Sequence, residues 1–330
     1  MSTRLGVGVV GAGRVGAVLG SALRAVGHPV IGVSAVSEES RERAETLLPG
    51  VPVLEVPEVV RRSELVLLAV PDDALAELVE GLARTGAWQP GQIVVHTAGR
   101  YGAGVLDAAR AMGVIPVALH PAMTFTGTSL DLSRLEGCTF AVTAPTPVLP
   151  IGQALVVEMG GEPVVIEESL RPLYHAALAH GANHLVVLVA QAGQALSAAG
   201  VRDPGAVLRP LLEAALDGAL RAESAAGDRE GEASNGAITT LTGPVRRGDA
   251  GTVRDHLAEL TDLAAHTGAA DVLDSYSALS RAATARALAA DLIRPEQGQS
   301  LLDALTPTHT PGSEGGSVPD APTPDPEDDA

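Results

Sequence analysis

Three glycines near the start of the chain have the spacing that binds phosphate groups. The apolar run 5–10 leads into the letters GAGRVG at 11–16, and an Ala- and Leu-rich segment, 17–27, follows. This order predicts a strand, a tight turn and a helix. The first glycine allows the turn, the second lets backbone approach a pyrophosphate, and the third lets the helix pack on the strand. The phosphates would lie on free N–H groups at the helix N-terminus. A glycine-rich turn that has lost its ligand is the alternative.

The end of the second expected strand, 28–34, bears on which dinucleotide would bind. An acidic residue about 20 residues past the glycines would bind the ribose 2′-OH of NAD. The segment 34–37 has two serines and no acid, and Arg14, Arg41 and Arg43 are cations that could reach a 2′-phosphate. We therefore expect NADP (NADPH), with NAD the less favoured cofactor. Arg41 and Arg43 would equally suit the solvated face of the next helix.

Two histidines and an asparagine have positions suited to proton transfer. His175 and Asn183 lie eight residues apart on a long expected helix, 170–199, so two turns separate them on one face. We predict His175 as general acid and Asn183 as the group that orients the substrate. His120 ends an expected strand at the edge facing the cofactor and is the rival proton donor. Either histidine could instead have a structural role.

Further along, the segment 242–249 has residues that could bind an anionic substrate. Arg247 could hold a carboxylate through two hydrogen bonds, and Thr242 belongs to the same predicted substrate site. In the alternative interpretation, Asp249 caps the following helix and pairs with Arg247. His180 and His184 are four residues apart, but the sequence offers no third ligand for them, so we predict no metal site.

Several strand ends are expected to meet at the edge where open α/β sheets bind ligands. The residues predicted to contact the dinucleotide are Gly11, Ala12, Gly13, Arg14, Val15, Gly16, Ser34, Ser37, Val70, Pro71, His96 and Thr97. Of these, His96 and Thr97 would border the nicotinamide rather than react.

The elements that must position these residues form two blocks. Strand patterns alternate with helices up to residue 166, at 5–10, 28–34, 51–54, 64–70, 93–97, 115–121, 138–143 and 163–166. This alternation predicts an α/β domain with a parallel Rossmann sheet, residues 1–166. Only helical patterns follow, which predicts an all-helical domain at 167–295. Residues 296–330 contain a weak helix, 297–305, and are otherwise rich in proline and acid, so we expect a disordered tail.

Composition narrows the class of partner. The 330 residues include 22 basic residues, all of them arginine, so no lysine-based chemistry is available. The formal charge of −18 argues against nucleic acid or an anionic membrane as a partner. The single cysteine cannot form an intramolecular disulfide. No signal peptide is recognised, and no apolar run reaches the ~18 residues of a membrane helix. We expect a cytoplasmic protein that acts on a small molecule.

A Rossmann domain followed by helices resembles the 6-phosphogluconate dehydrogenase-like superfamily, which includes ketopantoate reductases, pyrroline-5-carboxylate reductases and 3-hydroxyisobutyrate dehydrogenases. More closely, the chain resembles a bacterial family with a Rossmann-like domain and a C-terminal domain of unknown function. The resemblance lies in the segments 69–73 (AVPDD), 96–99 (HTAG), 120–125 (HPAMTF), 173–175 (LYH), 183–186 (NHLV), 241–244 (LTGP) and 247–249 (RGD).

The resemblance implies a reductase of a small 2-oxo acid, with 2-dehydropantoate to pantoate as the most specific candidate reaction. Ketopantoate reductases use a helical lysine and an asparagine, and this chain has no lysine to place there. An imine reductase resembling pyrroline-5-carboxylate reductase is a second interpretation. A regulatory protein that binds NADP(H) without turnover is a third. The long apolar helix faces lead us to expect a homodimer.

Overall fold

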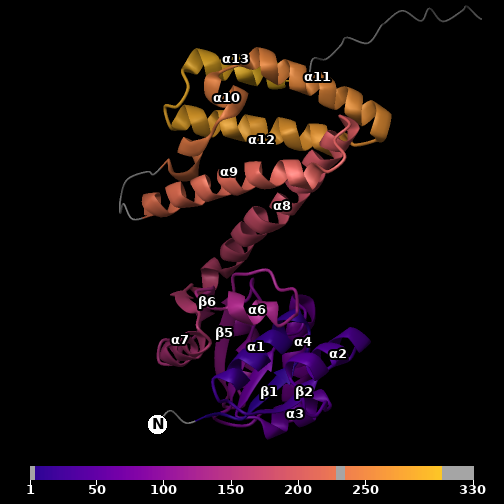
Figure 1. Cartoon of the computed structure of the whole chain (residues 1–330). Helices are drawn as coiled ribbons and strands as arrows, with labels where there is room; N and C mark the ends of the chain where they lie inside the picture. Colours follow the sequence, from indigo (N-terminus) through magenta and orange to yellow (C-terminus); the bar gives the residue numbers. More distant parts are fainter. Residues whose placement is uncertain (1–3, 228–234, 307–330) are drawn as a thin grey trace, which may run out of the picture. The chain divides into compact units, whose positions relative to one another are not determined.

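The computed structural model describes residues 4–227 and 235–306, and the chain forms two compact units, 1–185 and 186–330 (Figure 1). We describe each unit by itself. Most of the expected acidic tail, residues 307–330, lies outside the described residues.

The first unit is built on a seven-stranded sheet in the order β2-β1-β3-β4-β5-β6-β7. The strands are β1 (Val7–Val10), β2 (Val30–Ser34), β3 (Leu65–Leu68), β4 (Ile93–His96), β5 (Ile115–Pro121), β6 (Thr139–Thr143) and β7 (Glu162–Val165). The predicted Rossmann architecture is therefore confirmed. The segment 51–54, expected to be a strand, makes only one isolated bridge, between Val33 and Val53.

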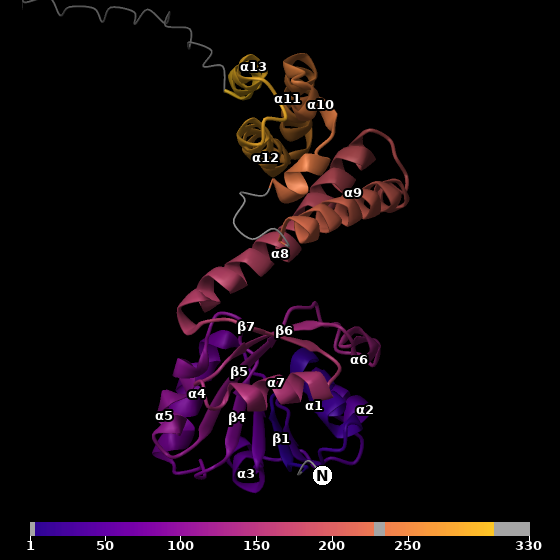
Figure 2. The same ribbon diagram turned by 90° about the vertical axis from the view of Figure 1, so that its left-hand side faces the viewer.

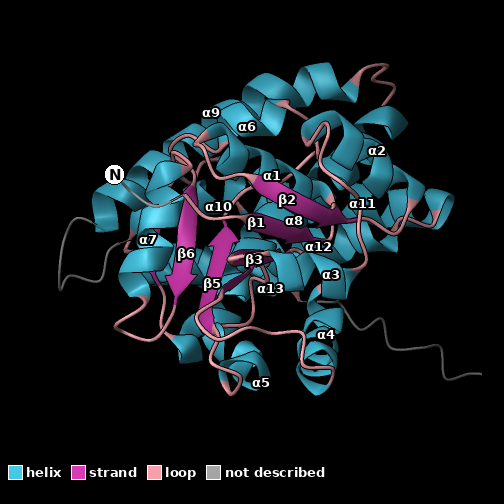
Figure 3. Ribbon diagram, turned by 90° about the horizontal axis from the view of Figure 1, so that it is seen from below, coloured by secondary structure: helices cyan, strands magenta, loops and turns pink. Residues whose placement is uncertain are grey.

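One strand pair departs from the expected parallel sheet. β6 runs antiparallel to β5, with Leu119 opposite Val142, whereas every other neighbouring pair is parallel (Figure 3). The sequence prediction was wrong here because a short, buried apolar strand has the same pattern in either direction. β5 therefore ends, and β6 begins, at the same edge of the sheet. At that edge Ala122 N–H donates to the Thr139 carbonyl, 2.8 Å away.

Helices cover both faces of the sheet (Figure 2). One apolar core packs under α1 (Arg14–Ala25), α2 (Glu38–Leu47) and α7 (Leu149–Glu158). The other packs under α3 (Val56–Arg62), α4 (Asp72–Arg84), and the short η1 (Ala103–Leu106) with α5 (Asp107–Arg110). Aliphatic side chains dominate both cores, as expected from a chain with 2% aromatic residues.

The first unit also contains the start of the long helix α8 (Arg171–Ala198), which follows the short turn η2 (Glu168–Leu170). Arg171 is fully buried. Its guanidinium donates to Thr143 Oγ1 through Nε (2.8 Å), and to the carbonyls of Ala118 (3.1 Å) and Ala141 (3.0 Å). Arg171 thus attaches the first turn of α8 to the β5–β6 pair.

The second unit is helical throughout its described residues. It contains the end of α8, α9 (Pro204–Gly227), η3 (Gly236–Thr240), α10 (Gly243–Arg247), α11 (Ala250–Thr267), α12 (Ala270–Ala289) and α13 (Pro295–Leu305). Its core includes Val253, Ala287 and Leu301, which have no exposed surface. Since Leu301 lies on α13, the weak helix expected at 297–305 is part of this core.

Helix α8 has an unusual amount of exposed apolar surface. Leu173 and Val186 are each 69% exposed, and residues 168–198 are long and apolar enough to cross a membrane by length and composition. Polar residues such as His180, Asn183 and Gln191 interrupt this helix, so it is not the uninterrupted apolar run of ~18 residues that the sequence analysis looked for. A single helix of this kind is weak evidence for a membrane, and its apolar surface equally suits contact with another protein chain.

Candidate active site at the carboxyl edge of the sheet

The glycine turn between β1 and α1 has the geometry of a phosphate-binding loop. Gly11 has φ +95°, which favours glycine, and a side chain at Gly16 would overlap the Gly11 carbonyl. A Cβ at Gly13 would meet nothing within 4 Å, so the backbone there is open to a ligand. The turn therefore fits the pyrophosphate of a dinucleotide at the start of α1. The predicted residues Ala12, Arg14 and Val15 lie in this turn and in the first turn of α1.

The predicted residues at the end of β2 have structural contacts of their own. Ser34 Oγ accepts a hydrogen bond from Gly11 N–H (3.0 Å), which holds the glycine turn against β2. Ser37 Oγ accepts from Ser40 N–H (3.2 Å) and caps α2.

The three predicted cations differ in exposure. Arg14 and Arg41 are exposed, whereas Arg43 is half-buried and donates to the Ala12 carbonyl at 3.4 Å. Of the two arginines on α2, Arg43 is therefore the one that reaches the glycine turn.

Strands β1, β3 and β4 end level with one another, because Val10, Leu68 and His96 are aligned in the sheet. The predicted residues Val70, Pro71 and Thr97 follow these strand ends, and Thr97 N–H donates to the Leu68 carbonyl at 3.1 Å. The structure thus brings these positions to the same sheet edge as the glycine turn.

His96 is fully buried at this edge, where it organises a loop. Its Nε2 lies 2.8 Å from the Gly102 carbonyl, and its Nδ1 accepts from Ala98 N–H at 3.2 Å. Burial lowers the pKa of His96 to about 4 against the opposing effect of the Gly102 hydrogen bond, and Arg171 and His120 contribute smaller decreases. The neutral ring therefore fixes the loop 97–102, which carries Gly99.

Two of the predicted catalytic residues meet around Gly99. His120 comes from β5 and His175 from the first turns of α8, and their ring centroids are 6.0 Å apart. A side chain at Gly99 would overlap His175 Nδ1 and lie 3.0 Å from His120 Nε2. The His120 Nδ1 atom is 3.0 Å from the Tyr174 hydroxyl. Gly99 thus leaves the space into which both imidazoles are packed.

The electrostatics of this group favour a neutral His120. Burial, with smaller electrostatic contributions from the neighbouring Arg171 and His175, lowers the pKa of His120 to about 4. Burial raises the pKa of the Tyr174 phenol, which keeps its proton at neutral pH. Burial also lowers the pKa of Arg171 to about 10, so the guanidinium stays charged. His175 Nδ1 and one terminal nitrogen of Arg171 are buried without a hydrogen-bond partner in the described chain.

The remaining predicted residues lie further along the chain, on α8 and in the second unit. Asn183 is exposed on α8, about 12 Å along the helix from His175 at ~1.5 Å per residue. Arg247 and Thr242 are exposed in the second unit. Asp249 caps α11 by accepting from Thr252 N–H (3.0 Å), as the alternative interpretation predicted, but the ion pair with Arg247 in that interpretation does not form among the described residues.

The two remaining histidines on α8 form a close pair but no larger group. His180 and His184 have their Nδ1 atoms 2.9 Å apart on the exposed helix. Among the residues that the structure describes, no group of three or more His, Cys, Asp or Glu side chains could hold a metal ion.

Sequence reasoning missed three members of the site. Tyr174 and Gly99 both lie in the segments that carry the family resemblance, LYH and HTAG, but a search for proton donors selects only the neighbouring histidines. Arg171 gave no signal, because an arginine before an apolar helix is usually a surface residue.

Comparison with known proteins agrees with this architecture. Residues 1–121 match the Rossmann-like domain, and residues 138–283 match a domain of unknown function, DUF2520. The chain therefore contains a Rossmann-like domain followed by a DUF2520 domain. The search of curated proteins gave no match.

Solved structures similar to this Rossmann-like, DUF2520 protein share its fold over most of the chain. A candidate NADP oxidoreductase from Bacteroides fragilis is 22% identical, with TM-score 0.63, covering 85% of this chain and 98% of that one. A protein from Thermotoga maritima is 19% identical, with TM-score 0.58, covering 86% and 99%. An imine reductase from Pseudomonas sp. is 18% identical, with TM-score 0.55, covering 92% and 100%. At these identities the likeness establishes the fold.

Proposed function

We propose that this protein is an NADP(H)-dependent oxidoreductase that reduces a small 2-oxo acid, with 2-dehydropantoate as the first substrate to test. The observation that carries the proposal is the grouping of His120, Tyr174 and His175 around Gly99, at the same sheet edge as the glycine turn. The names of the structural neighbours support nicotinamide chemistry in general.

The bound cofactor would supply the hydride, and the chain would bind and orient it. The turn at Gly11, Gly13 and Gly16 would hold the pyrophosphate on the first N–H groups of α1. Val70, Pro71 and Thr97 follow the next strand ends, where they would line the path of the cofactor toward Gly99.

His120 suits the role of hydrogen-bond donor to the substrate oxygen. If the protonated Tyr174 hydroxyl donates to His120 Nδ1, the neutral ring carries its proton on Nε2, the atom beside Gly99. A neutral imidazole can stabilise charge that develops on a carbonyl oxygen. Tyr174 would then be able to replace a proton that His120 gives up.

His175 remains our candidate general acid, since its Nδ1 is buried against Gly99 without a partner in the described chain. Asn183 would contact a part of the ligand distant from the reacting carbon, because it lies two helical turns away. Arg247 and Thr242 are proposed to bind the substrate carboxylate.

The test is NADPH oxidation, followed by absorbance, with a panel of 2-oxo acids that includes 2-dehydropantoate. We expect turnover with at least one oxo acid, and we expect His175→Ala to abolish it while NADPH binding persists. Unchanged turnover in His175→Ala would reject the role of that residue. Tight NADPH binding without consumption would favour a regulatory protein.

Imine reduction is the second candidate function. The match to the Pseudomonas imine reductase covers 92% of this chain, which supports including cyclic imines in the same panel. Turnover with imines alone would replace the oxo-acid proposal.

We also propose a cytoplasmic homodimer. Exposed apolar side chains lie along α8 and α9, among them Val186 (69% exposed) and Leu211 (64%), and a second copy would cover such surface. The single cysteine fits a reducing compartment. Light scattering is expected to give twice the chain mass, and a monomeric mass would contradict the dimer.

A further inference from the structure

A segment between β5 and β6 lies beside the glycine turn and belongs to neither matched family segment. We call residues 122–135 the strap. It lies between the Rossmann-like match, which ends at residue 121, and the DUF2520 match, which begins at 138. Phe125 and Leu135 bury its two halves in the same apolar core as α1 and α2. The strap is therefore fixed against the first two helices of the sheet.

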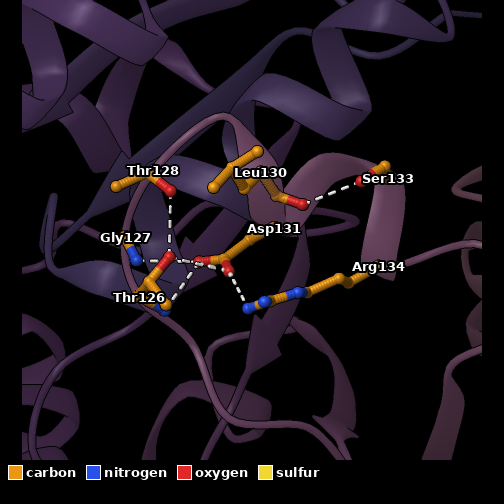
Figure 4. Close-up of polar contacts among 7 residues, drawn as sticks. All are labelled: Thr126, Gly127, Thr128, Leu130, Asp131, Ser133 and Arg134. Atoms are coloured by element: carbon orange, nitrogen blue, oxygen red, sulfur yellow. Dashed lines mark hydrogen bonds and ion pairs between the residues drawn. The ribbon is translucent and has the colours of Figure 1, made fainter.

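A buried carboxylate sets the shape of the strap (Figure 4). Asp131 has no exposed surface, and its carboxylate accepts hydrogen bonds from Thr126 N–H (2.8 Å), Thr126 Oγ1 (2.9 Å) and Gly127 N–H (2.7 Å). Arg134 lies 3.4 Å from the same carboxylate. Although burial raises the pKa of Asp131, these hydrogen bonds outweigh it and the pKa is lowered. The ionised side chain thus holds residues 126 and 127 in one conformation.

Gly127 lies directly on two arginine side chains. It has φ +80°, and a Cβ there would be 2.9 Å from Arg14 Cγ and 3.1 Å from Arg43 Cδ and Nε. The stems of Arg14, from α1, and Arg43, from α2, therefore converge at one backbone position of the strap.

These two converging arginines form no ion pair with an acidic group among residues 4–227 and 235–306. Glu39 interacts with Arg43 only weakly: its pKa is lowered chiefly by a hydrogen bond to its own backbone and by Ser37, with a smaller effect from Arg43. Two arginines whose side-chain stems meet at Gly127, and which have no carboxylate partner among the described residues, provide a place for an anion.

We propose that Gly127 and Asp131 of the strap are specificity residues that position Arg14 and Arg43 to bind the 2′-phosphate of NADP(H). The proposal rests on the proposed function, since it assumes a dinucleotide on the glycine turn. Arg14 and Arg43 contact the phosphate, whereas Gly127 and Asp131 act through them. The strap is thus part of the cofactor site, although it lies more than 100 residues beyond the glycine motif.

The experiment compares the binding of NADPH and NADH, measured by nicotinamide fluorescence, and of adenosine 2′,5′-bisphosphate and adenosine 5′-monophosphate, measured by calorimetry. Arg43→Ala is expected to weaken NADPH and the bisphosphate about tenfold or more, as for loss of a charge-assisted hydrogen bond, and to leave NADH within about twofold. Gly127→Ala should have the same selective effect, because its Cβ must displace Arg14.

Gly137→Ala is the matched control. Gly137 also has a left-handed backbone, with φ +71°, but a Cβ there meets nothing within 4 Å. It therefore carries the same backbone strain without touching an arginine, and we expect its ratio of NADPH to NADH affinity to equal that of the wild type. Asp131→Asn is expected to lower the ratio as Gly127→Ala does.

The outcomes separate the two proposals. Equal losses of NADPH and NADH affinity in Gly127→Ala, or equal effects of Gly127→Ala and Gly137→Ala, would overturn the role of the strap while the dinucleotide site stands. Wild-type protein that binds neither dinucleotide would overturn both proposals. If Asp131→Asn does not fold, Gly127→Ala and Arg43→Ala still decide the question.

Discussion

The buried His96 makes the stability of the first unit depend on pH in a predictable direction. The folded protein holds this ring neutral, with a pKa of about 4, whereas the unfolded chain titrates near 6.5. Between these values the unfolded state binds more protons, so stability falls as pH falls. The complete titration corresponds to about 3 kcal/mol, of which about 2 kcal/mol is lost between pH 7 and pH 5.

Trp88, the single tryptophan, provides the assay. It is 3% exposed in the core under α4, so its fluorescence follows unfolding of the first unit alone. Urea unfolding at pH 7 and pH 5 should show His96→Gln to be less stable than wild type at pH 7, because the hydrogen bonds to Gly102 and Ala98 are disturbed. The difference between the two proteins should shrink by about 2 kcal/mol at pH 5.

The control is His184→Gln, which removes an exposed imidazole from α8. It should retain the pH dependence of the wild type. Equal pH dependence in wild type and His96→Gln would refute the reasoning, because it would mean that the folded protein does not hold His96 neutral.

The other predictions concern the group around Gly99. Gly99→Ala should abolish turnover, since its Cβ would overlap His175 Nδ1, while dinucleotide fluorescence titration shows binding within about twofold; Gly181→Ala, with open space around it, is the control. Tyr174→Phe should lower kcat about 10- to 100-fold without changing NADPH affinity, and an unchanged kcat would remove Tyr174 from the proton path. Arg171→Met should destabilise the first unit by about 3 kcal/mol in the Trp88 assay, because three carbonyl or hydroxyl acceptors lose their donor, and a loss below about 1 kcal/mol would contradict the attachment of α8.

The features of the fold that depend on local pattern could be predicted from the sequence. The glycine turn, the buried strands and the helices of the second unit are each recognised from the pattern of neighbouring residues, and each lies close to its expected place. The direction of β6 could not be predicted, because it depends on whether the connection after β5 stays at the same edge of the sheet or crosses to the opposite edge. The place of α13 in the core could not be predicted either, since the burial of Leu301 comes from α11 and α12 rather than from its own sequence.

The candidate site was predicted only in part for a similar reason. His120 and His175 were predicted from their chemistry, and in the structure both rings lie against Gly99. Arg171 and Tyr174 depend on how α8 packs on β5 and β6, a contact between residues more than 25 positions apart. His96 was expected to border the ligand, yet its two ring nitrogens are both used by the loop that follows it.

The antiparallel direction of β6 determines where this chain can accept insertions near the proposed cofactor site. In an all-parallel sheet the connection after β5 would have to cross to the opposite edge before the next strand could start. Here β6 begins at the edge where β5 ends, so the 17 residues between Pro121 and Thr139 connect the two strands at that edge, and Gly127 among them lies against Arg14 and Arg43 beside the glycine turn. Insertions or replacements in this connection would alter the border of the proposed cofactor site without changing the order of the strands in the sheet.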